Sequence, residues 1–282
     1  MAAAALAPVD YLLHLADNAL VLGQRNAEWC GHGPVLEEDI ALANMSLDLV
    51  GQARLLYQYA AERINGDERE AARFAHLRGA RAHGAVTEDT LAYFRDTHEF
   101  RNCTLLEWPH HGPLAGSAVA PRDYATTIVR NFLYSALMVL VWDRLQSCAD
   151  TQLAAFAARS LKEVRYHLRH SHDWLVRLGD GTDESHRRAQ AALDHLLPGT
   201  QEFWVTSPAE QAAQADGTGV ATAALRDDWT ALVDEAIAQA TLDGTQRKGY
   251  VTQGKIGVHS EHLGFMLAEM QGLARAHPAA TW

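Results

Sequence analysis

The sequence predicts an all-α protein built from long helices. Proline, which breaks a helix interior, is absent from three long stretches, 35–108, 122–197 and 209–277. Val, Ile and Thr never gather into alternating runs bounded by turns, so no strand is predicted. The strongest helical pattern lies in residues 159–182, where one apolar stripe is formed by Leu161, Val164, Leu168, Leu175 and Leu178.

The first half of the chain supplies two long helices and one short helix. Residues 9–29 form the first, which the turn at 31–34 ends. The second runs from about residue 37 to residue 63 and buries Leu42, Met45, Leu49 and Leu56. We expect residues 67–86 to be looped or weakly helical, a short helix near 87–97, and a long connection over 98–121.

The second half supplies two more long helices and several satellites. A helix over 122–148 buries, among others, Ile128, Phe132 and Leu137, and 159–182 forms its partner. The remaining expected helices and connection are 183–197 before a break at Pro198-Gly199, then 222–242, a glycine-rich loop over 243–257, and 258–276. Two antiparallel pairs of long helices suggest a single ferritin-like bundle spanning residues 1–282.

The composition limits the classes of function. The chain has 282 residues and a net charge of −11, which argues against a protein that binds nucleic-acid phosphates. The start MAAAALAPVD has neither a basic region nor a long apolar core, so no signal peptide is expected, and no apolar run suggests a membrane span. Three widely spaced cysteines, Cys30, Cys103 and Cys148, predict reduced thiols in a cytoplasmic protein.

A metal centre would be expected where the long helices of such a bundle meet. A di-iron carboxylate bundle takes single Glu residues from two helices and Glu-x-x-His pairs from the other two. Here Glu163 and His167 are four residues apart, and the position three before His167 is Val164. The corresponding pair on the second helix is Leu49 and Gln52. We therefore predict a vestigial site with no metal, in which His167 and Gln52 belong to a hydrogen-bonded core.

Two further groups of residues are candidate sites. His259 and His262 are three apart, but no partner pair can be assigned to them, so we expect them to line a helix start. Residues 249–255 mimic part of a phosphate-binding loop, yet Ile256 follows the lysine and no strand precedes it. We reject a nucleotide site there and favour a solvated connection. A basic loop for an anionic substrate or a partner stays open, with Lys248, Lys255 and His259 as its candidate residues.

Other histidines are interpreted more simply. His83, His110 and His111 fall in predicted connections, and we expect them on the surface.

Four segments of the chain resemble a known family. They are LADNALVLGQRNAEWCGHGP (15–34), ALANMSLDLVGQARLLYQYAAE (41–62), SLKEVRYHLRHSHDWLVRLGDGT (160–182) and GVHSEHLGFMLAEMQ (257–271). They look like the structural C subunits of bacterial 1,2-phenylacetyl-CoA epoxidase, in collinear order over nearly the whole chain.

The resemblance implies a ferritin-like fold shared with a catalytic A subunit that carries the di-iron centre. That subunit reads Asp-Glu-Ala-Gly-His where this chain reads Asp48-Leu49-Val50-Gly51-Gln52, and it has Glu at the position of Val164 before the shared His167. The implied complex epoxidises the ring of phenylacetyl-CoA with O2, using electrons from NADPH through a separate reductase. This chain would be its non-catalytic scaffold, in a hetero-oligomer with further small subunits.

Three hypotheses follow from these residues. The first is the scaffold, with much of the interface supplied by the second helix and the 122–148 helix. The second is an independent metal-binding oxidase with a divergent site at Glu163, His167 and either His259 or His262. The third is a storage or binding bundle without partners. Gln52→Glu or Val164→Glu is expected to reduce stability, because each buries a carboxylate that no metal compensates.

Overall fold

The computed structural model describes residues 5–80, 85–112 and 122–280, and it is all-α. Ten α-helices lie within these ranges: α1 Val9–Ala27, α2 Leu36–Gly66, α3 Glu68–Arg73, α4 Glu88–Tyr93, α5 Tyr124–Leu145, α6 Thr151–Gly179, α7 Asp183–Leu196, α8 Pro208–Ala215, α9 Arg226–Gln239 and α10 Glu261–Ala276. Within the same ranges there is no strand, only an isolated bridge between Gln253 and Val258. The predicted fold class is confirmed.

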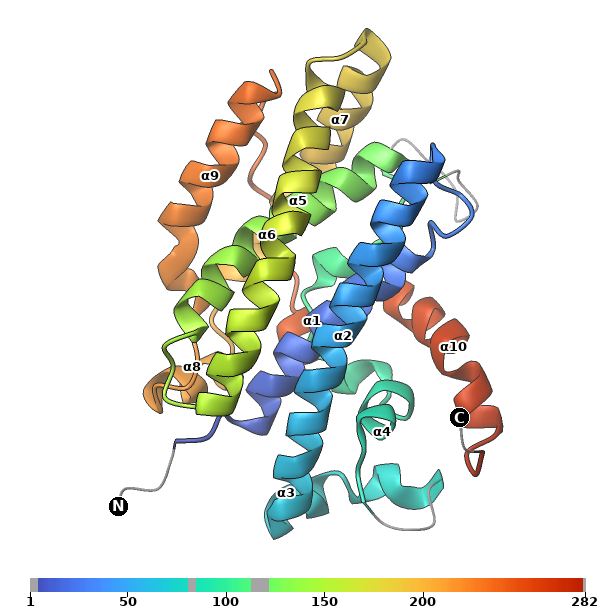
Figure 1. Ribbon diagram of the computed structural model, residues 1–282, viewed down its shortest axis with the longest axis vertical. Coiled ribbons are helices and arrows are strands. Elements are labelled where there is room, and N and C mark those ends of the chain that lie inside the picture. Colours follow the sequence, from blue (N-terminus) through green and yellow to red (C-terminus); the bar gives the residue numbers. More distant parts are fainter. Residues whose placement is uncertain (1–4, 81–84, 113–121, 281–282) are drawn as a thin grey trace.

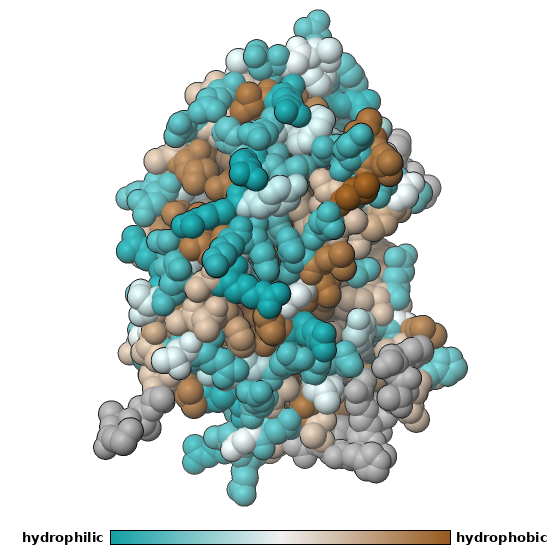
Figure 2. Space-filling view, viewed as in Figure 1, coloured by the Kyte–Doolittle hydropathy of each residue, from teal (hydrophilic) through white to brown (hydrophobic). Residues whose placement is uncertain are grey.

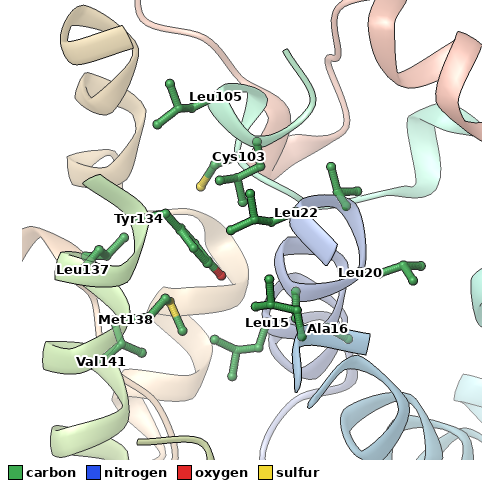
Figure 3. Close-up of a cluster of buried hydrophobic side chains, with 14 of the residues drawn as sticks. Leu15, Ala16, Leu20, Leu22, Cys103, Leu105, Tyr134, Leu137, Met138 and Val141 are labelled. Atoms are coloured by element: carbon green, nitrogen blue, oxygen red, sulfur yellow. The ribbon is translucent and has the colours of Figure 1, made fainter. Parts of the chain in front are cut away.

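Two helical hairpins form the bundle. α1 packs along α2, and α5 packs along α6, as Figure 1 shows near the centre of the molecule. α7 and α9 cover α5 and α6, whereas α4 packs against α2 and α10 packs on α4. Apolar side chains of α1, including Leu15 and Leu22, face Tyr134 and Met138 of α5 across the core (Figure 3).

Helix α5 is the helix to consider when asking whether the chain could cross a membrane. Among the described helices, α5 is the one that is long and apolar enough to cross a membrane. However, 89% of its apolar window is buried inside the fold, as is usual for the core helix of a soluble bundle.

One helix, α6, begins earlier than predicted, and another, α8, was not predicted; a local capping interaction explains each. α6 begins at Thr151, eight residues before the predicted start, because the Asp150 carboxylate caps it by accepting hydrogen bonds from the N–H groups of Gln152 and Leu153. α8 is absent from the elements that the sequence predicts. It begins with a capping box in which Ser207 and Glu210 exchange hydrogen bonds, with Pro208 in the first turn.

Residues 98–112 form a connection between α4 and α5, as predicted, but most of this connection is buried. Residues 97–99 and 104–106 form short 3-10 helices, and most of the residues from Phe100 to His110 are buried. This part of the chain is therefore packed inside the fold and does not lie on its surface. Residues 113–121 lie outside the described part.

Candidate functional site: the centre of the bundle

The five residues of the predicted vestigial site meet at the centre of the four long helices. Leu49, Gln52, Val164 and His167 are buried there, and Glu163 is half-buried beside them. The remaining side chains lining this centre come from α1 and α5: Leu22, Asn131, Tyr134, Ser135 and Met138. Together they leave no space for a water molecule. Four of the five residues therefore line the bundle centre, and Glu163 lies at its rim.

Polar groups at the centre satisfy one another across the gap between α2 and α6. The Gln52 side-chain amide donates to Glu163 at 2.9 Å. The His167 ring nitrogen Nε2 lies 3.1 Å from the Asp48 carboxylate. Asp48 and Glu163 are both partly exposed, so their charges remain partly solvated at the rim rather than facing the core.

The donor set does not fit a di-iron carboxylate centre. Such a centre requires several carboxylates and imidazoles that converge on one point. Here Leu22, Leu49, Val164 and Met138 occupy the interior, and no group of three His, Cys, Asp or Glu side chains that could hold a metal occurs within the described residues.

The candidate substrate loop is arranged differently from the prediction. Of its three candidate residues, Lys248 is exposed, whereas Lys255 and His259 are not. Lys255 is buried, and its ammonium group donates to both Glu210 oxygens at 3.0 and 3.1 Å and to the carbonyl of Phe203 at 3.0 Å. Although burial alone raises it, Lys255 and His14 hold the pKa of Glu210 below its ordinary value. A lysine fixed in this way is not available to an external anion.

His259 is also an internal residue. Its Nδ1 lies 2.8 Å from the buried Glu107 carboxylate, and its Nε2 lies 3.0 Å from the carbonyl oxygen of Phe100. Burial alone lowers the pKa of His259, but the hydrogen bond and charge of Glu107 outweigh it and raise that pKa. The structure does not bring His259 near Glu163 and His167, which it places in a separate, bundle-centred group.

The expectation of a surface His110 is wrong. Its Nε2–H donates to the carbonyl of Arg25 at 2.6 Å, and its Nδ1 accepts from Arg130 at 2.8 Å. Burial, followed by the charge of Arg130, lowers the pKa of His110 well below its ordinary value. His111 is half-buried, and His83 lies outside the described residues.

One buried ion pair is not among the sequence-based predictions. Arg95, just after α4, contacts both carboxylate oxygens of Asp17 on α1, and the Tyr57 hydroxyl donates to Asp17 at 2.5 Å. The pattern contained a clue, because Asp17 lies between the apolar residues 15–16 and 19–22 of the first helix. A charged residue inside such a run is buried only when it is paired.

The fold and this centre define a ferritin-like helical bundle with a closely packed centre. Residues 2–282 match the family model described as "Phenylacetic acid catabolic protein", and the chain belongs to that family. It is 43% identical over 272 residues to the C subunit of 1,2-phenylacetyl-CoA epoxidase from Escherichia coli (strain K12), covering 96% of this chain and 98% of that relative. The family resemblance drawn from the sequence is confirmed.

Proposed function

We propose that this chain is the non-catalytic structural subunit of a multicomponent 1,2-phenylacetyl-CoA epoxidase, and that it docks and stabilises the di-iron catalytic subunit in phenylacetate catabolism. The family membership and the relative named as the C subunit of that enzyme support an epoxidase subunit. The chain itself would then hold no iron and perform no step of the oxygenation.

The observation that carries this proposal is the composition of the bundle centre. Leu49, Gln52 and Val164 stand where a carboxylate bundle needs carboxylates and an imidazole, and tight packing fills the space between the helices. His167 Nε2 lies 3.1 Å from the Asp48 carboxylate, so this ring belongs to the hydrogen-bonded network between α2 and α6. The centre is therefore suited to holding four helices together rather than to holding ions.

An exposed apolar face of helix α2 supports the docking role. Four large apolar residues on α2, Leu36, Ile40, Leu47 and Val50, are exposed, and Leu36 and Leu47 reach 72% and 69%. Their spacing of four, seven and three residues places them on one side of the helix, which we call the α2 stripe. Figure 2 shows hydrophobic surface along this part of α2.

The same side of α2 is covered further along. Arg54, four residues after Val50, lies 3.6 Å from Glu88 at the start of α4, and the Gln58 amide donates to Glu88 at 2.9 Å. α4 thus covers the C-terminal half of this face and leaves the α2 stripe open. Exposed apolar residues in line with a covered face are typical of a surface that another protein buries.

The companion expectation for the 122–148 helix does not hold. α5 buries almost all of its apolar residues inside the chain, with Val139 and Leu140 only half-buried. Its high apolar content serves the core, and we assign the docking surface to α2 alone.

Metal analysis tests the non-catalytic role directly. Iron should be absent from the purified chain and present, at the level of one active subunit per pair, when the chain is purified with its catalytic partner. Iron near one or two equivalents in the lone chain would contradict the proposal and favour the independent oxidase, with Glu163 and His167 as the first residues to mutate.

The docking role is tested with the variant Ile40→Ser/Leu47→Ser. Each serine removes a large apolar side chain from the contact, so the affinity for the catalytic subunit should fall at least tenfold, while the melting temperature of the lone chain is unchanged. The matched control is Leu6→Ser/Val205→Ser, which changes two exposed apolar residues outside the stripe. Equal affinity of both variants would show that the stripe is not the docking surface.

We also propose a cytoplasmic location and contacts with the remaining small subunits and the reductase of the complex. The reduced state of the cysteines supports this location, because the three thiols, one exposed, one half-buried and one buried, are all unpaired.

A further inference from the structure

A groove lies between α6 and α9, and none of its lining residues belongs to the bundle centre or to the α2 stripe. It has a volume of about 350 Å³ and is open to solvent. In Figure 2, hydrophobic surface and strongly hydrophilic side chains lie next to one another over these two helices. This volume is within the range of about 300–1,000 Å³ that is usual for sites that bind small molecules.

The groove forms because the facing sides of the two helices carry polar side chains. Each helix lines it with residues at the i, i+3, i+4 and i+7 positions, which share one face. They are Arg165, Leu168, Arg169 and His172 on α6, and Leu232, Glu235, Ala236 and Gln239 on α9. Facing sides of packed helices are usually apolar, so these two faces do not close on one another. The helices converge just beyond the groove, where a Cβ atom on Gly179 would collide with the carbonyl oxygen of Ala240.

Apolar side chains form the floor of the groove, and polar side chains form its rim. Leu168 and Leu232 are half-buried and Ala236 is buried, whereas four of the five polar lining residues are exposed. The carboxylate that lines the groove is that of Glu235 on the α9 side, which accepts a hydrogen bond from the Gln239 amide at 3.2 Å. The floor can therefore cover the apolar body of a ligand while the rim holds a polar group.

The α6 side of the groove carries two guanidinium groups that the protein leaves largely unpaired. The Arg169 guanidinium lies over the Tyr166 ring, 5.6 Å from its centre, and forms no ion pair within the described part of the chain. The Arg165 guanidinium is 3.8 Å from Asp143, and both side chains are more than half exposed, so this pair contributes little. Two cations against the single carboxylate of Glu235 give the groove an excess of positive charge, although the whole chain has a net charge of −11.

We propose that the groove between α6 and α9 binds an organic monocarboxylate with an apolar body, such as an arylalkanoate. The carboxylate pairs with Arg169 and Arg165, because the planar guanidinium fork matches a carboxylate group, and the apolar body covers the leucines of the floor. Inorganic phosphate would leave that floor uncovered, and Glu235 would repel a second negative charge on the ligand. The inference does not rest on the proposed function, because it concerns neither the iron content nor the α2 stripe.

Titration of the purified full chain with phenylacetate, followed by NMR, tests this inference. Phenylacetamide, which has the same shape without the charge, is the control ligand. Phenylacetate should bind saturably with a dissociation constant of about 1 mM or less, because an open groove covers only part of the ligand. Phenylacetamide should bind about tenfold more weakly, since it cannot form the charge-assisted pair with the guanidinium groups. Equal affinity for both compounds, or no saturation with phenylacetate up to about 10 mM, would overturn the inference.

Two variants locate the site. Arg169→Gln should weaken phenylacetate binding about tenfold, whereas the matched control Arg159→Gln, at an exposed arginine of α6 outside the groove, should bind like the parent. Both side chains are exposed, so the melting temperature should not change. Gln239→Glu adds a carboxylate to the opposite side and should weaken the binding of phenylacetate but not of phenylacetamide. Parental affinity for phenylacetate in Arg169→Gln, or an equal change for both ligands in Gln239→Glu, would overturn the inference and leave the proposed function intact.

Discussion

Two buried regions of this molecule hold opposite kinds of side chains. The centre of the four long helices, where related folds hold metal ligands, is lined by aliphatic side chains such as Leu49 and Val164 and by polar side chains such as Gln52, and no carboxylate lines it. The irregular segments beside the bundle, by contrast, are held by buried charged pairs. Lys255 pairs with Glu210, and His259 with Glu107.

The difference follows from the backbone. Helices satisfy most of their own N–H and C=O groups, so packing between them does not require buried charge. Irregular segments cannot do so, and buried carboxylates here accept from their backbone: Glu202 from the N–H groups of Thr104 and Lys255, and Glu107 from that of Ser260. These buried charges therefore position connections, and Asp17 on α1 does the same by pairing with Arg95 and accepting from the N–H of Arg101.

Removing one partner of a buried pair should produce the largest effect. Lys255→Met leaves the Glu210 carboxylate buried without its cation, and the free energy of unfolding should fall by about 3–5 kcal/mol. Chemical denaturation measures this loss. Lys248→Met, at an exposed lysine seven residues away, is the control and should stay within about 0.5 kcal/mol of the parent.

A second change separates pairing from simple loss of packing. Lys255→Met/Glu210→Gln removes both charges and should recover part of the stability lost in the single variant. If the double variant is as unstable as the sum of both single changes, then the charges do not form a coupled pair.

Placing a charge at the bundle centre should have a somewhat smaller effect. Val164→Glu puts a carboxyl group among Leu22, Leu49 and Met138, and we expect a loss of about 2–4 kcal/mol, because the group must be buried without a partner or protonated. The measurement is the melting temperature with and without ferrous iron. Recovery of stability on adding iron would show that the centre can still hold a metal. The contrast between an uncharged bundle centre and charge-paired segments would then be wrong.

The two regions also differ in how far the sequence predicted them. Helical periodicity placed Leu49, Gln52, Val164 and His167 on inward faces, and the structure has them at the bundle centre, but their neighbours from α1 and α5 were not named. The environments of Lys255 and His110 were not predicted, since neither lies in an α-helix and their partners, Glu210 and Arg130, are 45 and 20 residues away. No periodicity relates such residues, and only the folded chain brings them together.

The unpredicted cap of α6 has a related cause. Asp150 not only caps that helix but also accepts hydrogen bonds from the N–H of Ala7 and the hydroxyl of Tyr59. A capping residue beside an apolar stripe can be read locally, but its use as a junction for three elements depends on tertiary contacts.

The smallest effect concerns His259 and depends on pH. Both ring nitrogens face acceptors, Glu107 and the carbonyl of Phe100, so the doubly protonated ring satisfies both, and its pKa is raised. The stability that protonated His259 contributes is therefore fully present below the ordinary pKa of about 6.5 and is lost as the pH rises through the raised pKa. His259→Gln should reduce the melting temperature more at pH 6 than at pH 8.5.

The comparison of variant and parent at each pH matters, because other histidines act in the opposite direction. Burial lowers the pKa values of His14 and His110, so these two residues reduce stability as the pH falls below about 6.5. Their contributions are common to the variant and the parent and cancel in the difference. An equal loss at both pH values would show that His259 is held as a neutral ring, and the buried pairing with Glu107 would then be a neutral hydrogen bond rather than an ion pair.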